Sequence, residues 1–465
     1  MPLNPWTSPF LLGQESVAVE GQLGYLFERL FTPTGIIAAA AVSGLLVLVF
    51  IIRKPLPILG GVVMALGTSV LPKSVELNQL IGPLQSLRFL SRSIGFALLG
   101  LIVVFALPGV SRGNRFRSAG LAATAFLVFQ LLYTIQLALF LQEGVLKGAF
   151  GVVAIVGMYL VFAVGFGRLM QDLASAISSM QLFVWVSVAF VLANLVQIAL
   201  GPSGSLMGGR LAGITGNPQM MGCIAALLIL ANAFVYSELP PLRPLRWICL
   251  LMIGFLGVLL LATGSRTAVI AISAGLFVMF RFQIGRLGVL GIVVAIGYLV
   301  VSLFLESPGA AVAERLASGE DTRTALWLQA IRRFLESPIF GEFVFLRPGD
   351  EPNGVESSLF RSLANMGLVG GIAVLAPAMI GISYGLKALR LASHRLEYKR
   401  LVDFYLGALT AVLVLNTFDG YAFGLLTFPV IFTYCLLATG NFLSEQADAE
   451  DAGVMVPEGI PAAGN

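Results

Sequence analysis

The sequence is poor in charged residues, histidine and cysteine. Of its 465 residues only 11% are Asp, Glu, Lys or Arg, one is histidine and three are cysteine. A soluble domain carries about 25% charged residues, so most of this chain cannot face water. The cysteines, Cys223, Cys249 and Cys435, all lie within apolar stretches, which argues against a disulfide framework or a metal cluster. We therefore expect neither a metal nor another cofactor.

Several motifs are also missing. The chain has no phosphate-binding glycine loop of the nucleotide-hydrolase type and no His/Cys metal spacing, which argues against ATP-driven transport. The formal net charge is only +4, and the basic residues lie mainly in short loops. That distribution favours control of membrane topology over nucleic-acid binding. Residues 1–34 lack a cationic segment ahead of an apolar core, so no cleavable signal peptide is expected.

What the chain does have is a series of long apolar runs, and 58% of its residues are hydrophobic. A helix of about 20 apolar residues crosses a bilayer, and lipid offers no hydrogen-bond partners, so such runs must be helical. The sequence predicts an all-α integral membrane protein with about 12–13 transmembrane helices. The predicted spans are 35–52, 56–71, 93–109, 119–142, 148–167, 178–200, 218–236, 247–263, 267–280, 287–305, 364–386, 401–417 and 423–444.

Basic residues predict the orientation of these spans, because they cluster in alternate loops. The clusters are Arg53–Lys54, Arg112–Arg117, Arg243–Arg246, Arg281–Arg286 and Lys387–Arg400. The positive-inside rule places all of them on the cytoplasmic side. Three segments then lie on the outer face, namely 201–217, 264–266 and 306–357, and only the last is a sizeable loop. That loop contains a predicted helix over 322–336.

The same alternation of cytoplasmic and outer loops predicts the domain organisation. Residues 1–34 form an N-terminal segment that is periplasmic or lies in the membrane interface. Residues 35–444 form a polytopic transmembrane domain, which includes the large periplasmic loop 306–357. Residues 445–465 are predicted to form a disordered cytoplasmic tail.

Three arginines on the outer face are candidates for binding an anion. Arg266 lies in a turn between two apolar runs that are short for a bilayer, so it should be recessed, where an arginine costs on the order of 2.5–3.5 kcal/mol. Arg323 shares an apolar stripe of helix 322–336 with Trp327. Arg210 lies just outside one span. Each could instead form a structural salt bridge or snorkel to the interface. Their grouping on one face favours an anion site, and a guanidinium fork suits the oxygens of a diphosphate.

Glu356 is the candidate general base. The sequence predicts that it opens the helix that follows the large loop and lies on the same side as Leu359 and Phe360. A carboxylate in that position could accept the proton of a hydroxyl nucleophile. The alternative is an acidic residue that only stabilises a helix N-terminus. Asp419, in a predicted outer turn, is a weaker candidate.

Three blocks of sequence, in this order and spacing, resemble bacterial O-antigen ligases and O-antigen polymerase-like membrane proteins. The resemblance covers about residues 178–420. The first block is Arg210–Gly213 leading to Gly216-Asn217-Pro218, and the second is Thr263–Ala268. The third runs from Arg323 through Trp327, Phe334 and Ser337-Pro338 to Gly341. In addition, Asn365–Gly370 resembles the start of the family's next span.

The resemblance implies a glycosyltransferase of the membrane-embedded C-type architecture. Such enzymes take a glycan from an undecaprenyl-diphosphate carrier at the periplasmic face of the bacterial inner membrane. By this analogy Arg210, Asn217, Arg266 and Arg323 bind the diphosphate, and the arginines stabilise it as the leaving group. The implied partners are lipid-linked glycans as donor and acceptor, membrane lipid, a chain-length regulator and a flippase.

One departure from the family affects the expected reaction. The ligases carry a histidine just before the last helix named above, whereas the only histidine here is His394, in a predicted cytoplasmic loop. This absence favours a polymerase that joins lipid-linked repeat units into O-antigen or exopolysaccharide, with Glu356 as the base. The alternatives are an O-antigen ligase that transfers glycan to lipid A core, and a flippase or other transporter of lipid-linked oligosaccharides.

Overall fold

The computed structural model of the protein describes residues 120–140, 145–170, 172–282, 322–341, 356–423 and 427–453. Four predicted spans, 35–52, 56–71, 93–109 and 287–305, lie outside the described residues. The predicted N-terminal segment 1–34 and most of the loop 306–357 lie outside them as well.

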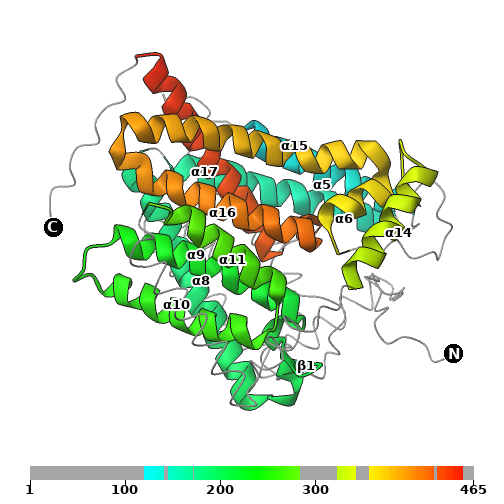
Figure 1. Ribbon diagram of the computed structural model, residues 1–465, viewed down its shortest axis with the longest axis horizontal. Helices are drawn as coiled ribbons and strands as arrows, with labels where there is room; N and C mark the ends of the chain where they lie inside the picture. The colour runs from blue at the N-terminus through cyan, green and yellow to red at the C-terminus, as the bar shows by residue number, and fades with distance from the viewer. Residues whose placement is uncertain are drawn as a thin grey trace.

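The first half of the described chain is almost entirely helical (Figure 1). A small two-stranded hairpin and two short 3-10 turns lie between α8 and α9. The elements are α5 (Leu121–Phe140), α6 (Val145–Met158), the π-helical η2 (Tyr159–Gly165), α7 (Phe166–Leu169), α8 (Leu173–Leu200), η3 (Ser203–Ser205), β1 (Leu206–Met207), β2 (Arg210–Leu211), η4 (Gly213–Thr215), α9 (Pro218–Glu238), α10 (Pro244–Ala262) and α11 (Arg266–Met279).

The second half continues as helices joined by short connections. The elements are α14 (Thr322–Glu336), α15 (Ser358–His394), η6 (Leu396–Tyr398), α16 (Lys399–Phe418), η7 (Tyr421–Phe423) and α17 (Phe428–Asp451). Nine of the predicted spans coincide with helices in the part of the chain that the structure describes, and α14 matches the helix predicted over 322–336.

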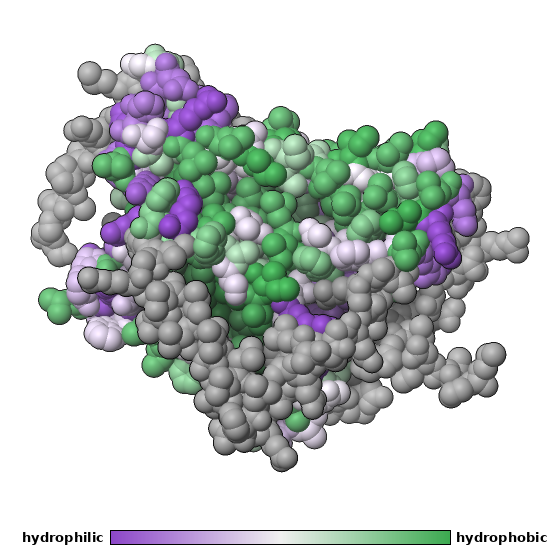
Figure 2. Space-filling model, in the orientation of Figure 1, coloured by the Kyte–Doolittle hydropathy of each residue, from purple (hydrophilic) through white to green (hydrophobic). Residues whose placement is uncertain are grey.

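The helices have the length and surface of a multi-pass membrane protein. In the described ranges, six helical stretches are long and apolar enough to cross a bilayer. They are Gly151–Leu169, Leu173–Leu200, Pro218–Glu238, Pro244–Ala262, Ser358–His394 and Leu396–Phe418. Figure 2 shows a broad hydrophobic surface over α15 and α16, bordered by hydrophilic side chains near the end of α17 and on α14. This pattern fits lipid around the middle of the bundle and water at its two ends.

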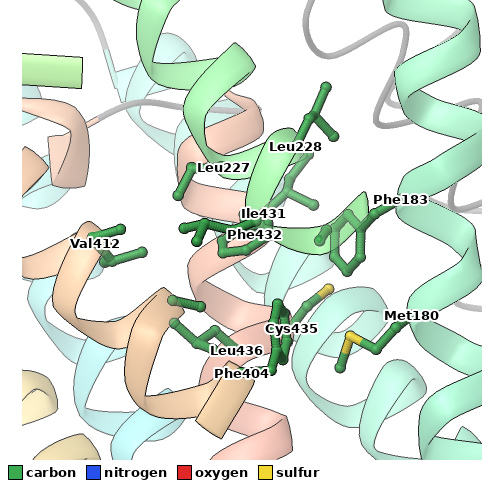
Figure 3. Packing of buried hydrophobic residues seen from close by; sticks show 14 of the residues in the cluster. Met180, Phe183, Leu227, Leu228, Phe404, Val412, Ile431, Phe432, Cys435 and Leu436 are labelled. Atoms are coloured by element: carbon green, nitrogen blue, oxygen red, sulfur yellow. The ribbon is translucent and has the colours of Figure 1, made fainter. Parts of the chain in front are cut away.

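Helices α9 and α17 form the centre of the bundle. Nearly every side chain of α9 from Met221 to Val235 is buried, as are most of those on α17. Figure 3 shows how residues of α8, α9, α16 and α17 interdigitate, with Phe183, Phe404 and Phe432 among the largest. Lipid is as apolar as these side chains, so close packing rather than exclusion of water holds the helices together.

Polar side chains inside the bundle are used to join helices. The amide of Asn232 on α9 donates to the hydroxyl of Ser187 on α8 (2.6 Å), and both residues are fully buried. Between α17 and α5, the hydroxyl of Tyr434 donates to Oε1 of Gln130 (2.8 Å). An unpaired buried polar group costs on the order of 1–3 kcal/mol in a soluble protein, and more where lipid surrounds the bundle. These pairs therefore help to fix which helices are neighbours.

Ion pairs collect at one end of the bundle. Arg281 after α11 pairs with Asp403 of α16 (2.6 Å), Arg400 pairs with Glu238 of α9 (3.4 Å), and Lys387 of α15 contacts the carboxylate of α17 residue Asp448 (2.8 Å). We call this the ion-pair end. It brings Arg281, from one of the basic clusters that the sequence assigns to one side of the membrane, together with Lys387 and Arg400 from another, so these two clusters meet at the same end of the bundle.

The structure corrects the boundary of the predicted tail. Helix α17 continues to Asp451, so residues 445–451 are helical rather than part of a disordered tail. Two of its acidic residues are paired, Asp448 with Lys387 and Glu450 with Arg395 (2.7 Å). Exposed ion pairs of this kind are weak, so the extension of the helix depends mainly on the packed turns that precede it.

Helix α15 contains a break that the sequence did not predict. Gly367 has φ +63° and ψ −151°, a conformation that is essentially open only to glycine. The break frees the amides of Leu368 and Val369 from their usual helical acceptors, and they donate instead to the carbonyls of Pro338 (2.8 Å) and Ile339 (3.5 Å). The turn that ends α14 therefore replaces the missing hydrogen bonds of α15.

The two backbones approach so closely that glycine is required on both sides. A Cβ atom on Gly367 would collide with the backbone of Ile339, and one on Gly341 (φ +72°) would collide with the backbone of Asn365 and Met366. Trp327 of α14 also stacks on Phe360 of α15, with ring centroids 5.0 Å apart. Helix α14 is thus fixed to the start of α15.

We predict that Gly367→Ala releases α14 from α15. The new methyl group meets backbone atoms that cannot yield, and the backbone angle is strained, so we expect a loss of stability of about 2 kcal/mol or more. The measurements are thermal unfolding in detergent and the rate of tryptic cleavage after the exposed Arg332. Gly254→Ala on α10 is the control, because nothing lies within 4 Å of an added Cβ there. Equal cleavage rates in both variants would contradict the prediction.

Candidate functional site

The segment between α8 and α9 carries the first predicted arginine. Its fold is anchored by Asn194 of α8, a fully buried residue whose Oδ1 accepts the amide of Ile214 (3.0 Å). Strands β1 and β2 pair antiparallel, with Met207 opposite Arg210. Nε of Arg210 donates to the carbonyl of Thr263 at the end of α10 (2.7 Å). The first two sequence blocks, 53 residues apart, therefore meet.

Arg266 follows directly in the turn that Arg210 contacts. It is the first residue of α11, and the hydroxyl of Ser265 caps this helix by accepting the amide of Ala268 (3.4 Å). Thr263, Gly264 and Ser265 are buried, and Arg266 is half-buried. A cation at a helix N-terminus opposes the helix dipole and costs about 0.3–1 kcal/mol, so helix stability does not explain this arginine.

Asn217 forms the N-cap of α9. Its Oδ1 accepts the backbone amides of Gln219 (2.8 Å) and Met220 (3.4 Å), and Pro218 occupies the first turn. The cap commits the side-chain oxygen of Asn217 to the helix. Asn217 was predicted to bind the diphosphate, and of its two polar side-chain atoms Nδ2 is the one that this cap leaves for such a contact.

The sequence predicted that Glu356 opens α15, and this prediction is wrong. The N-cap of α15 is Ser357, whose hydroxyl accepts the amide of Phe360 (3.4 Å), and the helix begins at Ser358. Glu356 thus precedes the cap, and the predicted helical spacing to Leu359 does not apply to it. Its carboxylate faces α9 instead, where Nε2 of Gln219 lies 3.3 Å from both Oε1 and Oε2.

The first two turns of α9 are the place where these pieces gather. Asn217 precedes them, Gln219 contacts Glu356, and a Cβ atom on Gly222 would lie 2.8 Å from Cβ of Ser265 and 3.0 Å from Oγ1 of Thr263. We call this region, with Arg210, Arg266 and Glu356, the arginine end of the bundle. It lies opposite the ion-pair end, because α9 runs from Pro218 here to Glu238 there.

Arg361 is a fourth arginine at this end, and the sequence analysis missed it. The side chain is only 7% exposed and lies in the first turn of α15. Its Nη2 donates to the hydroxyl of Tyr133 on α5 (3.0 Å), and the guanidinium lies over the ring of Phe423 (4.8 Å to the centroid). The signal was present in the sequence: a charge at the edge of a long apolar run usually marks a functional or paired group. The predicted span began at 364, so Arg361 fell between this span and the loop 306–357.

The turn between α16 and α17 closes over Glu356. A Cβ atom on Gly420 would lie 2.9 Å from the carbonyl oxygen of Glu356 and 3.7 Å from Nη1 of Arg361. The hydroxyl of Ser358 contacts Oδ1 of Asn416 (3.1 Å) and the carbonyl of Asp419 (3.3 Å). Asp419, the weaker acidic candidate, is therefore beside Glu356 in the fold and is 3% exposed.

Arg323 lies in the first turn of α14, and its side chain is outside the described residues. The helix itself is placed by Trp327, which packs against Phe360 of α15 and Phe418 of α16, with ring centroids 5.0 and 5.9 Å apart. Those two rings belong to the arginine end. The third sequence block therefore reaches the same end of the bundle as the other two.

No group of three or more His, Cys, Asp or Glu side chains that could hold a metal ion occurs among the described residues. In comparisons with known proteins, no family model matches the chain and no curated protein is significantly similar to it in sequence. The residues at the arginine end are therefore what indicates a function.

We predict that Arg361→Met destabilises the protein by about 1–3 kcal/mol, because it removes a buried guanidinium from Tyr133 and Phe423. Tyr133→Phe removes only the hydrogen bond and should cost about 1 kcal/mol. Thermal unfolding in detergent measures both. Arg390→Met, at an exposed position of α15 near the ion-pair end, is the control. A melting temperature for Arg361→Met equal to that of the control would count against this role.

Proposed function

We propose that the protein is a membrane glycosyltransferase that polymerises lipid-linked oligosaccharide units, with an undecaprenyl diphosphate as leaving group. The observation that carries the proposal is the meeting of Arg210, the Arg266 turn and Glu356 around the start of α9. These groups come from three distant stretches of sequence. Two cations and one carboxylate gathered at one end of α9 supply what transfer from a diphosphate requires, namely charge stabilisation of the leaving group and a base for the nucleophile.

The proposed step is a displacement at the anomeric carbon of the donor glycan. A hydroxyl of the acceptor glycan attacks that carbon while its proton passes to the carboxylate of Glu356. The bond between the anomeric carbon and the diphosphate oxygen breaks, and the electron pair leaves with the diphosphate. Arg210 and Arg266 stabilise the charge that develops there, because a guanidinium pairs its N–H groups with phosphate oxygens. Arg323 is proposed to join them from α14.

The position of His394 supports a polymerase over a ligase of the type with a histidine base. His394 ends α15, whereas Glu356 precedes its start, and the part of α15 after the break at Gly367 alone rises by roughly 40 Å, at about 1.5 Å per residue. The only histidine of the chain is thus at the ion-pair end and cannot reach a substrate bound near Arg266. In this proposal the carboxylate of Glu356 takes the role of the base.

The charges of the described residues also favour an enzyme over a transporter. A transport path through the bundle would need charged or polar groups along several spans. In the described chain the ion pairs lie at one end and Arg210, Arg266 and Arg361 lie at the other. The buried stretch of α9 between them, Met221 to Val235, has Asn232 as its strongest polar group.

The test is a reaction of purified protein with a synthetic undecaprenyl-diphosphate oligosaccharide. We expect wild-type protein to make glycan chains of more than one unit. Arg266→Ala should lower the rate about 10²–10³-fold, as loss of a group that stabilises transition-state charge does, and Glu356→Gln should lower it about 10²–10⁴-fold. Arg390→Ala should leave the rate unchanged, because it removes a guanidinium far from the arginine end.

The products separate the alternatives. A polymerase lengthens lipid-linked glycan without any other acceptor, a ligase forms product only when lipid A core is supplied, and a flippase forms no new glycosidic bond. Normal chain length in folded Arg266→Ala protein would overturn the proposed role of the arginines.

A further inference from the structure

Gln219 has an unusual relation to the carboxylate of Glu356. Its Nε2 lies 3.3 Å from Oε1 and 3.3 Å from Oε2, so one amide group spans both oxygens. The amide must present its nitrogen here, since a carboxylate only accepts hydrogen bonds and the amide oxygen would repel it. The two residues are 137 positions apart in the chain.

The backbone of Gln219 is held independently of this contact. It is the second residue of α9, its amide donates to Oδ1 of Asn217 (2.8 Å), and Pro218 restricts the turn. One turn further on, Gly222 packs against Thr263 and Ser265. The side-chain amide of Gln219 is thus presented from a fixed helix end.

Glu356 is held from the other side as well. Its carbonyl oxygen lies against Gly420, and the next residue, Ser357, is fixed as the cap of α15. With both its backbone and its carboxylate located, Glu356 has little rotational freedom. A base oriented in this way avoids the entropy loss that a free side chain suffers when it must find its proton.

The side chain of Gln219 is neutral, and this matters as much as its position. A cation bridging both oxygens would stabilise the carboxylate and weaken it as a base, whereas a neutral amide orients it and leaves its charge in place. Described ionisable groups at the arginine end include Arg361 on α15, Asp419 before η7, Cys223 one turn along α9 from Gln219, and Arg210 and Arg266. The start of α9 adds the positive end of its helix dipole, which favours an ionised neighbour.

From this geometry we infer that Gln219 is a positioning residue that orients the Glu356 carboxylate toward the acceptor hydroxyl. The inference rests on the proposed function, since it assigns Glu356 the role of base. It predicts that changes at Gln219 act on proton transfer and leave binding of the lipid diphosphate intact.

The experiment measures kcat, donor KM and the pH dependence of polymerisation for Gln219→Leu and Gln219→Glu. We expect Gln219→Leu to lower kcat about tenfold, less than loss of the base itself, with donor KM unchanged. Gln219→Glu places a second carboxylate beside Glu356. Two ionised carboxylates repel each other and favour a proton between them, so the acidic limb of the pH–rate profile should move to higher pH.

Gln329→Glu, at an exposed position of α14, is the matched control for the added charge and should leave the pH profile unchanged. A residue that only packs would alter the melting temperature but not the pH profile. An unmoved acidic limb in Gln219→Glu, or full kcat in Gln219→Leu, overturns the role of Gln219 while polymerisation by wild-type protein still stands. A wild-type protein that makes no polymer overturns the proposed function and this inference together.

Discussion

The arrangement of this protein depends on one constraint: within lipid, backbone groups must make their hydrogen bonds inside the protein, and a charged or polar side chain is costly to bury. In the described part of the chain the ion pairs lie at one end of the bundle and Arg210, Arg266 and Arg361 at the other, and polar side chains between them join helices, as Asn232 does with Ser187. The consequence is a clean separation of roles. The ion-pair end joins neighbouring helices, whereas the arginine end concentrates cations whose placement helix stability does not explain.

The break at Gly367 follows from the same constraint. A helix interrupted inside an apolar environment leaves amides that must be satisfied elsewhere, and here the carbonyls of Pro338 and Ile339 accept them. The interruption thus becomes an attachment point for α14. A helix outside the main bundle is thereby fixed to one inside it through backbone atoms, which side-chain substitutions alter least.

Within the described residues, the sequence was sufficient to predict nine spans, the common end of the Arg210 and Arg266 blocks, and the helix over 322–336, because each depends on local periodicity or on charge counted along the chain. It was insufficient for Arg361 and Gln219. The importance of Arg361 comes from Tyr133 and Phe423, and that of Gln219 from Glu356, partners more than 60 positions away that no local pattern identifies. The predicted helix start at Glu356 was wrong for a simpler reason, since serine caps a helix better than glutamate and two serines follow it.

The position of α17 in the chain has a consequence for biogenesis. This helix is the last in the described part of the chain, yet it occupies the middle of the bundle, beside α5, α15 and α9. Its contacts with the earliest described helix include Tyr434 with Gln130, 304 residues apart. During synthesis the earlier helices enter the membrane first, and the faces that pack against α17 have no protein partner until α17 inserts. Insertion of this segment is therefore the step at which the assembled bundle, and with it the geometry around Glu356, comes into being.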